Sequence, residues 1–556
     1  MRPLQRWTAD RHTSYDSAEM RSPSPGRAGG PRAARGWQKL ALVGLGLAVG
    51  IAAVVALELL LRATGIGGER RYDPFAGFSR TVPMFEPATR NDGTPVFRTA
   101  KARRVRFPQE FLAEKPANGF RVFVVGESSA AGVPYDVGHA FSGFLQMRLA
   151  AELPSLLVEV VNAAVPGYGS RRMLPVVEDI ARHEPDLLIF YAGHNEFAEP
   201  RYYAHLVGMD PRLFRAWEAL ASTRLYALAA RLPLIGVDVE PKPPRFEFES
   251  LDNPLQMFAV RTKHLEGAYP TDRERAWAER HYRFNVETMT DVVLDAGARM
   301  MLVTIGQNFA DWPPGGTAHR DGLDPASEAR WDAAVADGER RAADGDCAAA
   351  LDAFARALAI DDAHAGLHWR IAGCARRLER WDQARDAYRR ASDLDRMPHG
   401  APTRFNEVLR EVATERGALL VDAASVLEQA SPHGLVGDDQ FVDLVHPNLV
   451  ANQRIAATIA DALRAAGIPL PAGEWTGVDP VPPVDEVYAR EPALRTQERL
   501  VRASACILAQ RDACAHEAID AVLAGEPDNA LALQLRDGMA QRAAAASADP
   551  PAAGRP

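Results

Sequence analysis

Residues 120–132 read F-R-V-F-V-V-G-E-S-S-A-A-G, and the rest of the chain is organised around them. The apolar run at 122–125 is continuous, which is typical of a buried parallel strand, and Gly126 starts a turn that leads into a helix. A serine at such a turn lies at the carboxyl edge of a sheet, where open α/β sheets bind their ligands. Ser128 is therefore a candidate nucleophile. The alternative is that Ser128 or Ser129 only caps the helix.

The composition limits the classes of protein to consider. With 556 residues, 47% of them hydrophobic and 25% charged, the chain is globular in character and long enough for several domains. A net charge of −9 gives no general basis for binding nucleic acid. The four cysteines, Cys347, Cys374, Cys506 and Cys514, form no CxxC pair, which argues against zinc and redox motifs. One or two disulfides remain open, and no motif implies a metal or an organic cofactor.

The N-terminal segment predicts a membrane anchor. Residues 1–37 are rich in Arg, Ser, Pro and Gly and are expected to be a disordered tail. The anchor is placed at 38–62, because its apolar run is interrupted only by glycines and Glu58 and, at about 1.5 Å per residue, is long enough for one bilayer crossing. Basic residues are more frequent before this run than after it, which favours a cytoplasmic N-terminus. A cleaved signal peptide is the alternative.

Beyond the anchor, the chain divides into a short packing segment and an α/β domain. Residues 66–118 contain many Pro, Arg and aromatic residues without periodicity, and we expect short extended pieces that pack onto the next domain. Residues 119–324 and 399–467 alternate between strand and helix patterns. The strands are expected at 122–125, 156–161, 186–191, 299–305 and 418–422.

Polar residues follow several of these strands and complete a candidate site. Gly167 follows the second strand, where its backbone N–H can point into a site, although a glycine needed only for the turn explains it equally well. Asn195 follows the third strand, and its amide can donate to an oxyanion. Asp443 and His446 lie in a turn before the last helix of the domain. A carboxylate beside an imidazole is what a base that deprotonates serine requires.

Four sequence blocks together resemble those of the SGNH/GDSL hydrolase family. They read G-E-S at 126–128, N-A-A-V-P-G at 162–167, G-H-N-E at 193–196 and D-L-V-H at 443–446. The resemblance implies a three-layer α/β/α domain with a mostly parallel sheet of about five strands. It also implies that Ser128 is the nucleophile, His446 the base and Asp443 its partner, with Ser128, Gly167 and Asn195 forming the oxyanion hole. Glu127 and Glu196 depart from the family pattern, in which Asp is usual.

The segment at 325–398 does not fit such a domain. The pattern that begins at Asp346 returns 34 residues later at Arg380, with small and aromatic residues at the same positions. This period resembles the tetratricopeptide repeat, and the alternative is ordinary amphipathic helices. A weaker copy predicts a helical, repeat-like segment at 485–542, followed by a disordered Ala/Pro-rich tail at 543–556.

These features lead to one main functional hypothesis and two alternatives. The main hypothesis is a membrane-anchored serine hydrolase that cleaves an ester outside the cytoplasmic membrane, on an acylated glycan or lipid, with a protein partner on the repeats. The first alternative is an O-acyltransferase of envelope polysaccharide that uses the same Ser128, His446 and Asp443. The second alternative is an inactive scaffold that recruits partners through its repeats.

Overall fold

A parallel five-stranded sheet forms the centre of the protein. The computed structural model describes residues 31–66, 83–101, 107–199, 207–221, 223–229, 270–397 and 400–548. The strands are β4 (Gly119–Gly126), β5 (Leu157–Asn162), β6 (Leu187–Tyr191), β7 (Arg299–Val303) and β8 (Leu419–Val421). They lie in the order β5-β4-β6-β7-β8, and every neighbouring pair is parallel. The predicted α/β fold with about five strands is confirmed.

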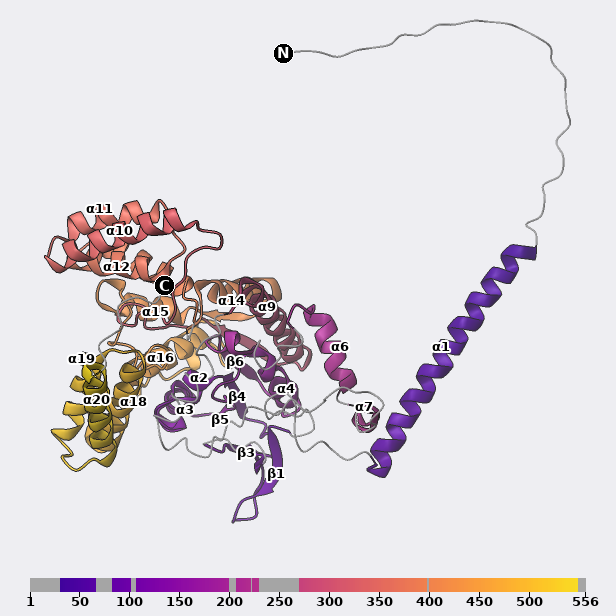
Figure 1. Ribbon diagram of the computed structural model, residues 1–556. Coiled ribbons are helices and arrows are strands. Elements are labelled where there is room, and N and C mark those ends of the chain that lie inside the picture. Colours follow the sequence, from indigo (N-terminus) through magenta and orange to yellow (C-terminus); the bar gives the residue numbers. More distant parts are fainter. Residues whose placement is uncertain are drawn as a thin grey trace, which may run out of the picture. The chain divides into compact units, whose positions relative to one another are not determined.

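Helices cover both faces of this sheet and give the domain three layers. One layer holds α3 (Phe141–Glu152) and α16 (Leu449–Ala465), and the other holds α4 (Ser170–Ile180), α9 (Asp272–Asp295) and α14 (Thr403–Arg416), as Figure 1 shows. Helix α9 begins with a capping box in which the side chain of Thr271 accepts from Glu274 N and the Glu274 carboxylate accepts from Thr271 N. Strand β4 has strands on both sides and helices on both faces, so it is buried from Phe120 to Gly126.

A second, antiparallel sheet packs against the start of β4. It contains β1 (Phe85–Thr89), β2 (Pro95–Thr99) and β3 (Glu110–Leu112). The rings of Phe85 and Phe111 both contact Phe123 of β4, with centroids 5.8 and 5.2 Å away. These strands are short extended pieces within residues 66–118, and the aromatic residues at 72, 75 and 78 lie outside the described part of that segment.

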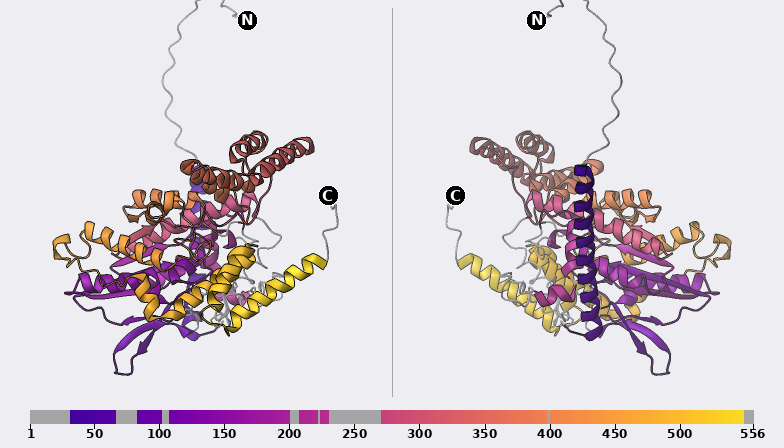
Figure 2. Two further views of the ribbon diagram at one scale, coloured as in Figure 1. Left: turned by 90° about the vertical axis from the view of Figure 1, so that its left-hand side faces the viewer. Right: turned by 90° about the vertical axis from the view of Figure 1, so that its right-hand side faces the viewer.

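Two groups of helices are added to the α/β domain. The inserted helices, between β7 and β8, are α10 (Pro325–Ala343), α11 (Cys347–Leu358), α12 (Ala365–Arg377) and α13 (Trp381–Asp393). The C-terminal helices are α17 (Val484–Arg490), α18 (Pro492–Leu508), α19 (Asp512–Leu523) and α20 (Ala530–Ala548). Figure 2 shows them as two separate groups. A disulfide joins Cys506 to Cys514, whereas Cys347 and Cys374 are free.

Helix boundaries differ from the predictions at both ends of the chain. Helix α20 continues to Ala548, so the predicted tail from residue 543 is helical over its first part. Helix α1 (Pro31–Thr64) begins before the predicted anchor, and the rest of the predicted N-terminal tail lies outside the described residues. Alanine and arginine are strong helix formers, which explains both extensions.

Helix α1 contains the apolar segment that was predicted to be an anchor. Its part from Ala41 to Thr64 is long and apolar enough to cross a membrane. The Glu58 carboxylate in this part accepts hydrogen bonds from Arg62 and from the backbone N–H groups of Arg224 and Leu225. These two N–H groups begin α7 (Arg224–Ala229), so Glu58 caps that helix.

The packing of the small sheet on β4 predicts a large effect of one ring. Phe111 is 1% exposed, and Phe111→Ala should lower the free energy of unfolding by about 3–5 kcal/mol because it leaves a cavity against Phe123. Phe97, which stacks on Phe111 but is half-buried, is the matched control, and Phe97→Ala should cost less. Urea unfolding of the full-length protein in detergent measures both. Equal costs would show that the sheet does not pack as described.

Candidate active site

Ser128 lies where β4 ends and a short helix begins. A Cβ on Gly126 would lie 2.3 Å from Tyr191 O, so only glycine allows β6 to approach the end of β4 this closely. Glu127 then precedes α2 (Ser128–Ala131) as its N-cap. Ser128 is 7% exposed, whereas Ser129 is completely buried. Of the two serines, only Ser128 is hydrogen-bonded to a candidate base.

The structure brings Ser128, His446 and Asp443 into one hydrogen-bonded chain. Ser128 Oγ lies 2.9 Å from His446 Nε2, and His446 Nδ1 lies 2.6 Å from Asp443 Oδ2. The other carboxylate oxygen of Asp443 accepts from the backbone N–H groups of Val445 and His446 at 2.8 and 2.9 Å. These bonds close the turn on itself and aim the imidazole away from its own backbone toward β4. The structure therefore brings together residues that lie 318 positions apart in sequence.

The surroundings of Asp443 keep it ionised. Burial alone would raise the pKa of the Asp443 carboxyl, but the charge of His446 and the hydrogen bonds from His446 and Val445 outweigh burial and hold this pKa below its ordinary value. An ionised carboxylate at Nδ1 leaves Nε2 as the nitrogen that accepts a proton from serine, and it stabilises the imidazolium that forms. The arrangement can thus activate a hydroxyl for nucleophilic attack.

The three candidate oxyanion donors lie at the same edge of the sheet. Gly167 has a φ of 80°, and a Cβ built on it meets nothing within 4 Å, so the space beside its backbone is open. The backbone N–H of Ser128 is in the first turn of α2, where no intrahelical acceptor exists. The side-chain amide of Asn195 donates to Glu127 Oε2 at 2.6 Å and to Tyr168 O at 3.3 Å. The longer of these two bonds is the one an oxyanion can replace more easily.

Glu127 has a structural role that sequence reasoning missed. Its side chain is completely buried and accepts four hydrogen bonds, from the backbone N–H groups of Gly193, His194 and Asn195 and from the Asn195 amide, at 2.6–3.0 Å. Four donors compensate the cost of burying a carboxylate. Glu127 thereby joins the turn after β4 to the loop after β6. The only sequence signal was the unusual Glu in the G-E-S block.

Glu196, the other departure from the family pattern, belongs to a second buried carboxylate group. It accepts from Ser170 N and from Ser170 Oγ at 2.6 and 2.9 Å. Burial, with a further contribution from the charge of Glu199, raises the pKa of Glu196 well above its ordinary value. Glu199 in turn binds the guanidinium of Arg172. These residues fix the loop that carries Asn195 to the start of α4 and do not touch Ser128.

Both added groups of helices are attached beside the loop that carries His446. Asp438 in this loop accepts from Asn308 Nδ2 at 2.8 Å and pairs with Arg502 of the C-terminal helix α18. Asp311, after β7, accepts from Asp438 N at 3.1 Å and from Arg376 of the inserted helix α12 at 2.8 Å. The loop is therefore held by the α/β domain and by both groups of helices.

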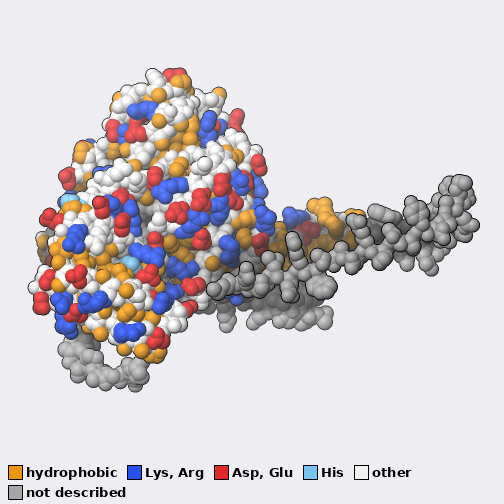
Figure 3. Space-filling model, turned by 90° about the horizontal axis from the view of Figure 1, so that it is seen from above, with side chains coloured by type: hydrophobic (Ala, Val, Ile, Leu, Met, Phe, Trp, Pro, Cys, Tyr) orange, Lys and Arg blue, Asp and Glu red, His pale blue; other side chains and the backbone are white. Residues whose placement is uncertain are grey.

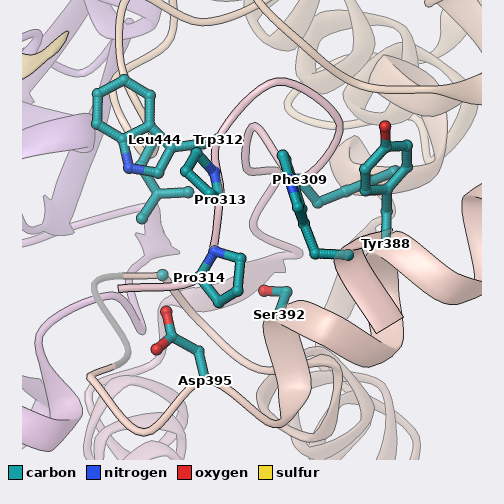
Figure 4. A pocket seen from close by; sticks show the side chains of 10 residues that line it. Phe309, Trp312, Pro313, Pro314, Tyr388, Ser392, Asp395 and Leu444 are labelled. Carbon is teal, nitrogen blue, oxygen red and sulfur yellow. The ribbon is translucent and has the colours of Figure 1, made fainter. Parts of the chain in front are cut away.

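A small cavity lies next to the same loop. Leu444, between Asp443 and His446, lines it together with residues of the inserted helices, and Figure 4 shows these side chains around Pro313 and Pro314. Tyr388 and Ser392 come from α13, and Trp369 from α12. The inserted helices thus contribute side chains to the immediate surroundings of the candidate site. Within the described residues, no cluster of three or more His, Cys, Asp or Glu side chains suits a metal ion.

One protein-family model matches part of the chain. Residues 124–376 match the profile of the GDSL-like Lipase/Acylhydrolase family, a range that includes Ser128, Gly167 and Asn195 and ends before Asp443 and His446. No curated protein matches the chain.

Several solved structures are similar at low identity. The crystal structure of TesA is 15% identical and covers 62% of this chain and 98% of its own, with a TM-score of 0.26. An acetyl xylan esterase, AlAXEase, is 11% identical and covers 62% and 100%, with a TM-score of 0.28. A lipase/acylhydrolase from Enterococcus faecalis is 13% identical and covers 62% and 96%, with a TM-score of 0.27. At these values the likenesses carry no argument of their own.

The contacts of Glu127 predict that its length and charge both matter. Glu127→Gln places an amide NH₂ opposite backbone N–H donors, and each donor left unpaired costs about 1–3 kcal/mol, so kcat on a small ester should fall roughly tenfold or more. The side chain in Glu127→Asp is one methylene shorter and loses only part of these contacts, so kcat should fall less than in Glu127→Gln. Glu110→Gln, which changes a carboxylate paired with Arg90 and Arg98 on the small sheet, is the control. Unchanged kcat in Glu127→Gln would contradict the role.

Proposed function

We propose that this ester hydrolase works outside the cytoplasmic membrane with Ser128 as its nucleophile. The proposal starts from the match of residues 124–376 to the GDSL-like Lipase/Acylhydrolase family. The observation that carries the proposal is the chain of two hydrogen bonds from Ser128 Oγ through His446 to Asp443, 2.9 and 2.6 Å long. Nucleophile, base and the group that orients the base are each within reach of the next, which is the geometry that acyl transfer to serine requires.

The reaction follows from this geometry in two steps. Ser128 Oγ attacks the ester carbonyl carbon while His446 Nε2 takes its proton, and the bond from carbon to the leaving oxygen breaks as His446 returns the proton to the alcohol. Water then attacks the acyl-enzyme, with His446 again as base, and the carboxylic acid leaves as Ser128 regains its proton. Asp443 stabilises the imidazolium in both steps and stays ionised.

The negative oxygen of each tetrahedral intermediate needs donors at the sheet edge. We assign this task to the backbone N–H groups of Ser128 and Gly167 and to the Asn195 amide. The positions of Ser128, Gly167 and Asn195 after the three neighbouring strands β4, β5 and β6 support the assignment, because they place the donors at one edge of the sheet. Asn195 is already oriented by Glu127, and its amide would exchange the 3.3 Å hydrogen bond to Tyr168 O for one to the oxyanion.

Two features support a location outside the cytoplasm. The apolar segment from Ala41 to Thr64 precedes the domain and suits a single-pass anchor. The disulfide between Cys506 and Cys514 is of a kind that persists in oxidising compartments and is rare in the cytosol. The surface in Figure 3 carries acidic and basic side chains side by side, and the net charge of −9 does not favour a polyanionic partner.

The nucleophile is tested with an active-site probe. A fluorophosphonate should label the wild-type protein and Ser129→Ala but not Ser128→Ala, because only Ser128 is hydrogen-bonded to His446. Hydrolysis of p-nitrophenyl acetate should fall almost equally in Ser128→Ala and His446→Ala and somewhat less in Asp443→Ala, since the three groups act as a unit. Labelling that survives in Ser128→Ala would overturn the assignment.

The location is tested with reporter fusions. Alkaline phosphatase fused after residue 120 should be active in bacterial cells and should sediment with the membranes, because the anchor places this point outside. A cytoplasmic reporter at the same position should be inactive. Recovery of the active fusion in the soluble fraction, shortened by the apolar segment, would favour a cleaved signal peptide over an anchor.

A further inference from the structure

An open groove lies on the inserted helices. Side chains from α10 and α12 form two of its sides, and Pro313 and Pro314 belong to the third. Its volume is about 690 Å³, within the range of roughly 300–1,000 Å³ typical of ligand sites. Trp331 and Trp369 are among its lining residues, with Asp332, Glu339 and Arg370.

The third side of the groove is held firmly by the protein itself. The carboxylate of Asp395, just after α13, accepts from the backbone N–H groups of Gly315 and Gly316, both at 2.8 Å. Gly316 O in turn accepts from Arg396 N at 2.9 Å. The segment that begins with the two prolines is thus fixed to the inserted helices, so the groove is formed before any ligand arrives and costs little to order.

The groove shares part of its lining with the small cavity beside the loop that carries His446. Pro313, Pro314 and Trp369 line the groove and also this cavity, which Leu444 lines as well. Leu444 lies between Asp443 and His446, so a few side chains separate a ligand in the groove from the catalytic base. Figure 4 shows Leu444, Pro313 and Pro314 together around this cavity.

The chemistry of the lining indicates the kind of ligand. The half-buried indole of Trp369 provides flat apolar surface, whereas Trp331 is 5% exposed and packs against His319 and His364 beneath the groove. Carboxylates and a guanidinium provide hydrogen bonds for hydroxyl groups. Asp332 and Glu339 carry negative charge against one positive Arg370, which also pairs with Glu339. Burial lowers the pKa of His364, a further lining residue, to about 4, so it adds no charge at neutral pH. The net negative lining disfavours anionic ligands.

We propose that this groove binds the neutral oligosaccharide part of an acylated glycan and holds it beside the catalytic residues. The proposal rests on the ester hydrolase function and names its substrate class. An accessible indole flanked by groups that hydrogen-bond hydroxyls suits a sugar ring, and the volume of about 690 Å³ has room for more than one sugar.

Chain length of the substrate tests the proposal. With full-length protein in detergent, kcat/KM for acetylated cello-oligosaccharides should rise by about tenfold or more from one sugar to about six, because longer chains reach the groove. Ala336→Trp fills the groove from an exposed position of α10 and should abolish most of this rise. Ala355→Trp, at an exposed position of α11 away from the groove, is the matched control and should keep the wild-type rise.

Binding is measured separately from catalysis. Ser128→Ala should bind the acetylated hexasaccharide with a change in tryptophan fluorescence, and the double variant Ser128→Ala/Ala336→Trp should bind it at least about tenfold more weakly. Failure of wild type to hydrolyse p-nitrophenyl acetate would count against the hydrolase function and leave this binding result intact. Equal binding by the two variants, or no dependence of kcat/KM on chain length in an active wild type, would overturn the groove proposal.

Discussion

The candidate site depends on the hydrogen bonds that the buried carboxylate of Glu127 accepts. Glu127 follows β4, directly precedes Ser128, and accepts four N–H groups from residues 193–195 beyond the end of β6. The ladder of a parallel sheet stops where its strands stop, so the turns after two strands are independent unless a side chain joins them. A buried carboxylate is costly without donors, and the four bonds together compensate that cost. They fix Ser128 and Asn195 relative to each other before any substrate binds.

The base reaches this edge from a distant part of the chain, and its loop needs support of its own. Asp443 closes the turn around His446, but Asp438 and Asp311 determine where the whole loop lies. Arg502 and Arg376 bring the C-terminal and inserted helices to these two carboxylates. Arg502 and Asp438 are half-buried, whereas Arg376 is exposed, and each carboxylate has a second hydrogen-bond partner, Asn308 Nδ2 for Asp438 and Asp438 N for Asp311. A shift of either group of helices therefore acts on the position of His446.

The sequence predicted the features that depend on local patterns and missed those that depend on distant contacts. Strand β4 is recognisable in the sequence because its apolar run ends abruptly at Gly126. The blocks that contain Asn195 and His446 are recognisable because each is a short local pattern of polar residues. The reach of Glu127 to residues 193–195 could not be predicted, because it depends on how two strands 66 residues apart pack side by side. The extra turns of α1 and α20 were missed because a composition typical of disorder also contains strong helix formers.

The position of the inserted helices connects the fold to the choice of substrate. All five strands are parallel, so the chain leaves β7 at the same edge of the sheet where it leaves β4 and β6. An insertion at this point starts at the same edge of the sheet as Ser128, whereas an insertion at the amino ends of the strands would start at the opposite edge. Trp369 and Tyr388 line one small cavity together with Leu444. The candidate catalytic residues belong to the sheet edge, while most residues of the proposed glycan groove belong to the inserted helices, which are tied to that edge through Arg376 and Asp311.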